Sequence, residues 1–316
     1  MRRSLWACVA AALLLATSVA TASAGWPGLD GTLIYSSSRG ITLSDTDPGT
    51  RDVLRIAPRQ GYDPAWSPDG RRFVVVIDGD LWVYAADGTH GKRITSGPTY
   101  DETPSWSPDG RHLIFGQEGI TSEPIAEVSA RGGSVKRLTH PPKGVFDFGP
   151  VWSPDGTRIA FQRDRQHVID TYDIWLMRAD GSGARAWAKD AGFEGYPAWS
   201  PDSTRLAYEQ MVSGHKQVRI RPVDSGKAVT ITDLPNAIEP DWSPDGAWIV
   251  VGNGKDGLVR VPAQGGEPVL ITKDGFSSSW QPLPDPGPGP SCQTGVSPDG
   301  TYARLIGSGI QPPCEY

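Results

Sequence analysis

Acidic side chains recur in this chain a few positions before a series of tryptophans. Each of six segments carries at least one acid, three to six residues ahead of its Trp: Asp63, Asp101, Glu102, Asp147, Glu194, Glu239 and Asp274. Oxygen-rich clusters suit Ca²⁺ or Mg²⁺, and a ring of carboxylates concentrates negative potential that attracts a basic peptide. Two other interpretations stay open: acids that hydrogen-bond loop N–H groups, and solvated surface charge.

The tryptophans belong to a repeated phrase, Pro-x-Trp-Ser-Pro-Asp-Gly. The repeat residues are Trp66, Trp106, Trp152, Trp199, Trp242 and, in a reduced copy, Trp280. Their spacings are 40, 46, 47, 43 and 38 residues. A period near forty with four strands per unit is typical of a β-propeller. Pro-Asp-Gly is turn chemistry, so the repeated Asp is expected to be structural. Ser203 stands where Gly is expected, which predicts slight backbone strain.

Each unit predicts four strands, which we name A to D from the axis outward. The Trp lies on A, and the apolar run after the turn, such as 73–77, predicts a strand B buried on both faces. The first unit, 32–56, lacks strand A, and 277–280 supplies one. We therefore expect an all-β, six-bladed propeller over 25–282, closed by strands from both ends. Seven blades is the alternative, because 297–300 repeats Ser-Pro-Asp-Gly.

These repeats resemble the TolB-like (WD40-like) propeller family over about 250 residues. The resemblance implies the fold and, by analogy with TolB, a periplasmic protein that binds a lipoprotein partner. In TolB an α/β domain precedes the propeller, whereas only 25–30 stand between the predicted mature start and the first predicted strand here. We therefore expect the propeller without that α/β domain, and this departure argues against the role that TolB has in its envelope complex.

The chain ends carry further expectations. Arg2 and Arg3, an apolar run and Ala22-Ser23-Ala24 predict a signal peptide over 1–24, hence an exported protein, periplasmic or extracellular. No later segment predicts a membrane span. Residues 283–290 form a Pro/Gly linker. In an exported protein Cys292 and Cys314 favour a disulfide that ties a hairpin over 291–316, with two free thiols as the alternative.

The functional prediction is a non-catalytic binding propeller. No Gly-x-Ser-x-Gly, phosphate loop or His-Glu-x-x-His occurs in the sequence, and a net charge of −6 disfavours nucleic acid. We expect a monomer that binds a protein, peptide or glycan at the channel face, through the acids and a long charged loop that contains Arg163, Arg165, His167 and Asp170. No cofactor is expected. The alternative is a lyase or hydrolase that uses the acids with Ca²⁺ or Mg²⁺.

Overall fold

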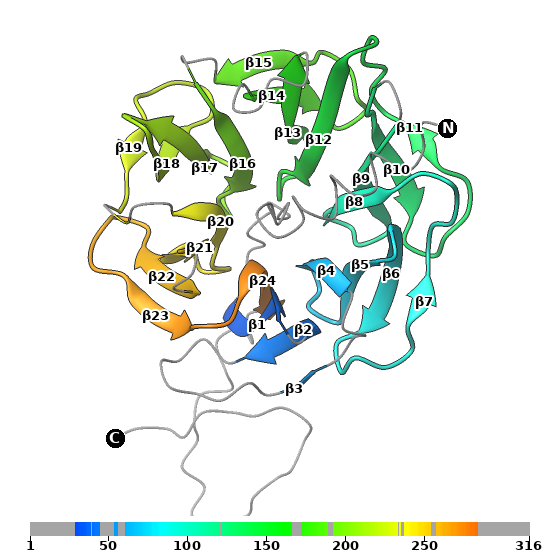
Figure 1. Ribbon diagram of the computed structural model, residues 1–316, viewed down its shortest axis with the longest axis horizontal. Coiled ribbons are helices and arrows are strands. Elements are labelled where there is room, and N and C mark those ends of the chain that lie inside the picture. Colours follow the sequence, from blue (N-terminus) through cyan, green and yellow to red (C-terminus); the bar gives the residue numbers. More distant parts are fainter. Residues whose placement is uncertain are drawn as a thin grey trace, which may run out of the picture. The chain divides into compact units, whose positions relative to one another are not determined.

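The computed structural model describes residues 29–38, 40–44, 54–55, 61–119, 122–165, 172–188, 192–232, 234, 237–253 and 257–283. These residues form an all-β structure, with twenty-four strands and no helix in the described part. The strands make six four-stranded antiparallel sheets that stand as blades around a central axis (Figure 1). The predicted six-bladed propeller is confirmed.

The blades follow the chain in order, with strand A innermost. Blade 1 is β4 (Gly61–Trp66), β5 (Arg72–Ile77), β6 (Asp80–Ala85) and β7 (Lys92–Arg93). Blade 2 is β8 (Asp101–Trp106), β9 (His112–Gln117), β10 (Ile125–Ser129) and β11 (Lys136–Arg137). Blade 3 is β12 (Val145–Trp152), β13 (Arg158–Arg165), β14 (Asp173–Arg178) and β15 (Arg185–Ala188). Blade 4 is β16 (Glu194–Trp199), β17 (Arg205–Val212), β18 (His215–Pro222) and β19 (Val229–Thr230). Blade 5 is β20 (Ile238–Trp242), β21 (Trp248–Gly252), β22 (Leu258–Pro262) and β23 (Val269–Thr272). Blade 6 is β24 (Phe276–Leu283), β1 (Leu29–Ser37), β2 (Gly40–Ser44) and β3 (Leu54–Arg55).

The core lies between the blades. Strand B has solvent-excluded side chains on both faces, as in Val74, Val75 and Val76, because a neighbouring blade covers each face. The repeat tryptophans are almost fully buried. An arginine from the preceding blade covers some of them, as Arg72 does Trp106, with 4.8 Å from guanidinium carbon to ring centroid.

The tryptophans join neighbouring blades by one of two hydrogen bonds. Which bond forms depends on the type of the residue that stands just before the repeat Trp in the preceding blade. Where that residue is Ala or Val, the indole Nε1 donates to its carbonyl, as Trp106 does to Ala65 at 3.0 Å; Trp199 and Trp242 do the same. Where it is Ser or Asp, the tryptophan backbone N–H donates to its side chain instead, which holds for Trp66, Trp152 and Trp280.

The Ser-Pro-Asp-Gly turns explain the repeated aspartates. In the first turn Asp69 Oδ1 accepts hydrogen bonds from Ser67 Oγ (2.6 Å) and Arg71 N (3.1 Å). Partial burial opposes ionisation, but these bonds outweigh it and lower the pKa of Asp69. The final turn residue has a positive φ, 65° at Gly70 and 60° at Ser203. The predicted structural role of the aspartate and the strained position of Ser203 are both confirmed.

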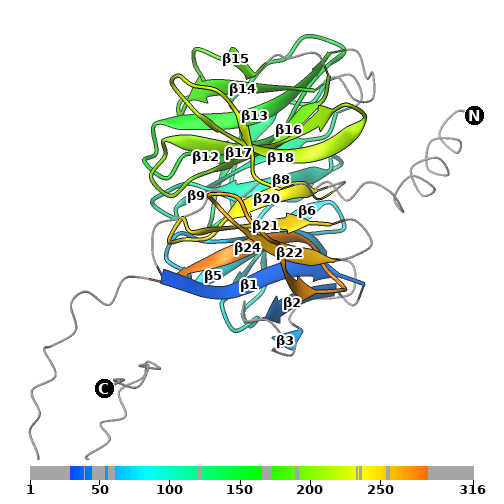
Figure 2. The ribbon, with the colours of Figure 1, turned by 90° about the vertical axis from the view of Figure 1, so that its left-hand side faces the viewer.

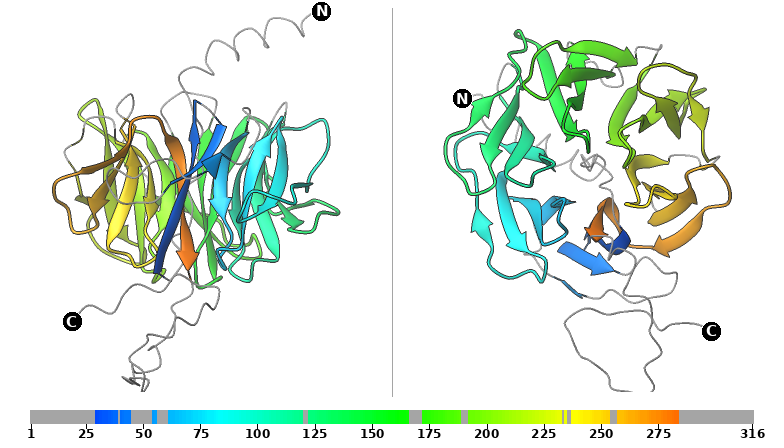
Figure 3. Two further views of the ribbon diagram at one scale, coloured as in Figure 1. Left: turned by 90° about the horizontal axis from the view of Figure 1, so that it is seen from below. Right: turned by 180° about the vertical axis from the view of Figure 1, so that it is seen from behind.

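Strands from the two ends of the described region close the ring. β24 pairs antiparallel with β1, and the two lie side by side in Figures 2 and 3. Gln281 reinforces the junction: its Oε1 accepts from Thr32 N (3.1 Å) and Oγ1 (2.9 Å), and its Nε2 donates to Gly70 O (2.8 Å). Blade 6 is thereby bound to blade 1 by side-chain as well as strand contacts.

All described residues fall within one compact unit. The predicted signal peptide, the hairpin, and Cys292 and Cys314 lie outside the described residues. The predicted linker does too, except Leu283, where β24 ends. In the described part of the chain, no helix long and apolar enough to cross a membrane was found.

Candidate functional site: the channel end of the inner strands

Every innermost strand carries a β-bulge at the same place. The residue three positions before the Trp has a positive φ in all six blades: Asp63 (51°), Thr103 (51°), Gly149 (57°), Tyr196 (52°), Glu239 (58°) and Ser277 (46°). The A–B register shifts at each of these points, as between Tyr62 and Ala65 in blade 1. A bulge re-aims the side chain that it carries, and five of the six accept backbone strain that glycine would avoid.

Side chains at the bulges link one blade to the next around the axis. Thr103 N donates to the carboxylate of Asp63, and Gly149 N donates to Thr103 Oγ1 at 3.1 Å. On the other side of the ring, Ser277 N donates to Glu239 Oε2 and Ser277 Oγ donates to Asp63 Oδ1, both at 3.3 Å. We call these six positions the bulge ring. Its polar atoms are largely used inside the fold.

The other predicted acids are also engaged. Asp147 is fully buried and takes two hydrogen bonds from Arg163, Nε to Oδ1 at 2.5 Å and Nη2 to Oδ2 at 2.8 Å. Gln210 Nε2 donates to Glu194 Oε1 at 3.1 Å, and Gln117 Nε2 to Asp101 Oδ1 at 3.3 Å. These three acids thus accept hydrogen bonds from side chains of their own fold.

Asp274 lies apart from the buried acids. It is partly exposed and accepts from Ser38, N to Oδ1 at 3.0 Å and Oγ to Oδ2 at 2.6 Å. Ser38 follows β1 directly, and Asp274 lies in the connection from β23 to β24, so this contact joins that connection to blade 6.

Glu102 forms a carboxyl pair with a residue that sequence analysis missed, Glu123 from the loop before β10. Burial first, and then the neighbouring Glu118, raise the pKa of Glu102 to about 7, while its hydrogen bond with Glu123 favours ionisation. Burial and the charge of Glu102 raise the pKa of Glu123 well above its usual range. The two carboxyls therefore titrate as an interacting pair, each with a pKa above its usual value. Glu123 lies far from any repeat tryptophan, so the Trp spacing could not reveal it.

Aromatic side chains gather at this end of the channel, and sequence analysis did not single them out. Over blades 3 and 4, Phe148 contacts Tyr172 (5.0 Å between centroids), Tyr172 contacts Phe193 (5.3 Å) and Phe193 contacts Tyr196 (6.1 Å). Burial first, then Glu239 and other acidic or phenolic groups nearby, raise the pKa of Tyr196 well above its usual range.

A second group of tyrosines stands over blades 1 and 2. Tyr100 is 56% exposed, and its ring lies so close to Gly79 that a Cβ there would be 2.4 Å from it. Tyr62 is partly buried, and burial together with Asp63 raises its pKa. We call Tyr62, Tyr100, Phe148, Tyr172 and Tyr196 the aromatic rim.

The predicted partner loop is placed only in part. Arg163 lies in β13, where it pairs with Asp147 and stacks over Trp175 at 4.2 Å. Arg165 ends β13, and no side-chain position is described for it. His167 and Asp170 lie outside the described residues. Among the residues that are described, no group of three or more His, Cys, Asp or Glu side chains could hold a metal ion.

The propeller fold agrees with comparisons to known proteins. Residues 34–170 and 142–282 each match the family described as the TolB beta propeller domain. The chain belongs to this family. None of the curated proteins compared with the sequence matches it.

Solved structures of this fold have varied roles. TolB from Acinetobacter baumannii is similar with a TM-score of 0.67 and 22% identity, over 80% of this chain and 67% of that one. A chain of a nidogen/laminin complex is similar with a TM-score of 0.63 and 12% identity, over 80% of this chain and 99% of that one. An oligogalacturonate lyase in complex with manganese is similar with a TM-score of 0.54 and 15% identity, over 74% of this chain and 70% of that one. At these identities the likeness shows the fold alone.

Proposed function

We propose that this chain is an exported, non-catalytic binding propeller, which engages a protein, peptide or glycan at the channel end that carries the aromatic rim. The observation that carries the proposal is the rim itself, with Tyr100 more than half exposed beside partly buried rings. Tyrosines present a large rigid surface with a polar tip, which suits both protein and sugar contacts.

The fate of the acids supports binding over catalysis. Asp63, Asp101, Asp147, Glu194 and Glu239 accept hydrogen bonds from the fold's own donors. Carboxylates engaged in this way hold the scaffold rigid, and a rigid scaffold positions the surrounding loops for recognition. A propeller of this fold in a nidogen/laminin complex offers a precedent for protein binding.

The test is a binding screen with a matched pair of variants. The labelled full chain is applied to a glycan array and a random peptide array, beside Tyr100→Ala and the control Val229→Ala, whose side chain is 62% exposed on outer strand β19. We expect a ligand whose affinity falls tenfold or more in Tyr100→Ala and is unchanged in Val229→Ala. A ligand that binds both variants as it binds the wild type contradicts the proposed site.

A propeller enzyme is the second candidate, favoured by the Glu102–Glu123 pair. A carboxyl group with a pKa of about 7, beside a second carboxyl whose pKa is also raised, is suited to acid–base chemistry. Cleavage of a polysaccharide in a substrate panel, abolished by Glu102→Gln with the fold intact, would establish this candidate in place of the first.

A further inference from the structure

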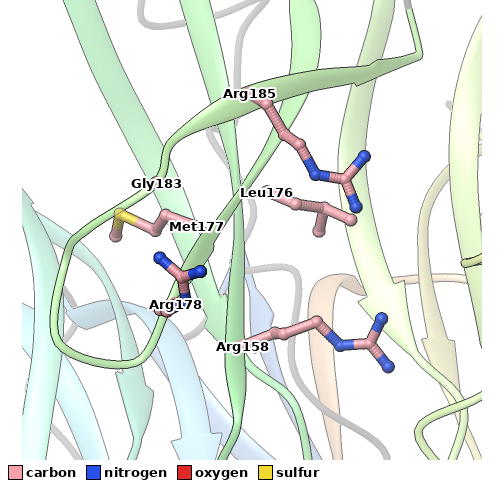
Figure 4. A pocket seen from close by; sticks show the side chains of 6 residues that line it. All are labelled: Arg158, Leu176, Met177, Arg178, Gly183 and Arg185. Carbon is pink, nitrogen blue, oxygen red and sulfur yellow. The ribbon is translucent and has the colours of Figure 1, made fainter.

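We infer that blade 3 carries a binding site for an oxyanion, phosphate or carboxylate, in a pocket separate from the aromatic rim. The pocket has a volume of about 280 Å³ and is lined by Arg158, Leu176, Met177, Arg178, Gly183 and Arg185 (Figure 4). Arg158 follows the A–B turn, and Arg178 and Arg185 flank the C–D turn. These turns lie at the opposite end of the blade from the bulge ring.

Three strands bring the arginines together. Arg158 on β13 pairs with Arg178 on β14, and Leu176 on β14 pairs with Arg185 on β15. Figure 4 shows Arg158 and Arg185 pointing to the same side, with Leu176 between them. Three cationic groups set around one pocket repel each other unless an anion lies between them, and this occurs in a chain whose net charge is −6.

Arg158 is held in place by blade 4. Its guanidinium lies 5.3 Å from the ring centroid of Trp199, and its Nη1 is 3.0 Å from Asp224 Oδ1. The Asp224 side chain is 82% exposed, so this ion pair is solvated and weak. A guanidinium has five N–H donors in a planar fork, which leaves Arg158 able to bind a second oxyanion without moving.

The nearby turn acids do not line the pocket. Asp155 Oδ1 accepts from Ser153 Oγ, Thr157 N and Thr157 Oγ1, at 2.6 to 2.9 Å. Asp180 Oδ1 accepts from Ser182 N at 2.8 Å. They moderate the positive charge of Arg158 and Arg178, while Oδ1 of each is engaged in its own turn. Arg185 is exposed.

The walls define the chemical class of the ligand. Arginine forks match the paired oxygens of phosphate and carboxylate, and the surface between Arg158 and Arg185 is apolar, because Leu176 lies there and is 2% exposed. The site therefore suits a small oxyanion joined to a compact apolar or sugar body. It is independent of the proposed channel function, since no residue is shared.

Calorimetric and thermal-shift titrations of the full chain test this inference. The probes are inorganic phosphate, glucose 6-phosphate and citrate, at constant ionic strength set with chloride so that screening is equal. We expect saturable binding of at least one probe and a raised unfolding midpoint. Phosphate and its ester binding without citrate assigns a phosphate group, and the reverse assigns a carboxylate.

The variant pair is Arg185→Gln and Arg137→Gln. Arg137 lies on β11, which is the outermost strand of blade 2, as β15 with Arg185 is of blade 3. Arg137 is exposed and does not line the pocket. Arg185→Gln should weaken binding about tenfold or more, and Arg137→Gln should leave it unchanged. Among the residues that the structure describes, Arg185 has no cross-blade contact like that of Arg158 with Trp199. Folding of Arg185→Gln should therefore be preserved, which circular dichroism would verify. No saturable binding of any probe, or equal binding by Arg185→Gln and wild type, overturns the site.

Discussion

At the scale of single residues, most polar groups near the axis serve the fold. Asp147 and Arg163 form a bidentate ion pair. The side chains of the bulge ring form hydrogen bonds between blades. The Glu102–Glu123 pair differs, because its members have the same charge when ionised. Glu118 and Asp147 add further negative charge around Glu123. Proton uptake by this pair therefore makes the folded state depend on pH.

The contribution of the Glu102–Glu123 pair to the free energy of unfolding should fall as the pH rises from about 5 to 8. The folded-state pKa of Glu102 is about 7, above its usual 4.5, so the folded state holds more protons than the unfolded chain between these values. The stability that this proton binding contributes is complete below the pKa of the unfolded state, and it is lost as the pH rises through the pKa of the folded state. Glu123→Gln, which mimics the protonated form, should raise the free energy of unfolding at pH 8 by on the order of 1 kcal/mol or more, with little effect at pH 5.

Urea unfolding at both pH values measures this effect. The control is Glu127→Gln, because Glu127 makes only a 3.8 Å contact with the exposed Lys136. Equal pH dependence in wild type and Glu123→Gln would show that the two carboxyls do not titrate as an interacting pair.

At the scale of elements, the repeat made the strands predictable and left the bulges unseen. Turn chemistry and apolar runs located strands A to D, and Ser203 was expected to be strained. The acids stand three to six residues before the Trp. Because this distance varies, the sequence indicates a group of charges and not one fixed backbone position. The offset that matters structurally is three, and it is occupied by chemically unlike residues such as Thr103, Gly149 and Tyr196. A pattern of backbone angle without a pattern of residue type cannot be found in a single sequence.

The turn at Ser203 combines a strained backbone with a compensating bond. Its φ is 60°, and its Oγ accepts from Asp155 N of blade 3 at 3.0 Å. Ser203→Gly relieves about 1 kcal/mol of strain and loses a bond of about the same value, so its stability should stay near wild type. Ser203→Ala loses the bond and keeps the strain, and should be about 1 kcal/mol less stable than the glycine variant.

Urea unfolding of the two variants side by side checks this ordering. An alanine variant as stable as the glycine variant would mean that the turn tolerates positive φ without cost.

At the scale of the whole molecule, ring closure was predictable because the first unit lacked strand A and the last supplied one. What the sequence could not indicate was the role of Gln281, which bonds to Thr32 and Gly70 across more than two hundred residues. Contacts between blades 6 and 1 depend on which side chains meet after folding. The same holds for the arginine pocket, whose members come from three neighbouring strands of blade 3.

Removing the Gln281 side chain should weaken the closed ring. Gln281→Ala leaves Thr32 N and Gly70 O without these partners, which should cost roughly 2 kcal/mol in the free energy of unfolding. Gln217→Ala is the matched control, because Gln217 accepts one 3.3 Å bond from Thr230 within blade 4 and should cost less than about 1 kcal/mol. Chemical denaturation compares them, and equal losses would show that closure does not depend on Gln281.

The two kinds of tryptophan hydrogen bond also give the ring a built-in set of spectroscopic reporters. Each junction between blades holds one repeat indole. Trp106, Trp199 and Trp242 donate through Nε1, whereas the indole nitrogens of Trp66, Trp152 and Trp280 are buried without a partner in the described structure. Indole proton resonances and their exchange with deuterium should therefore separate into two sets of three. The opening of each junction can then be followed by its own signal, without adding a label to the chain.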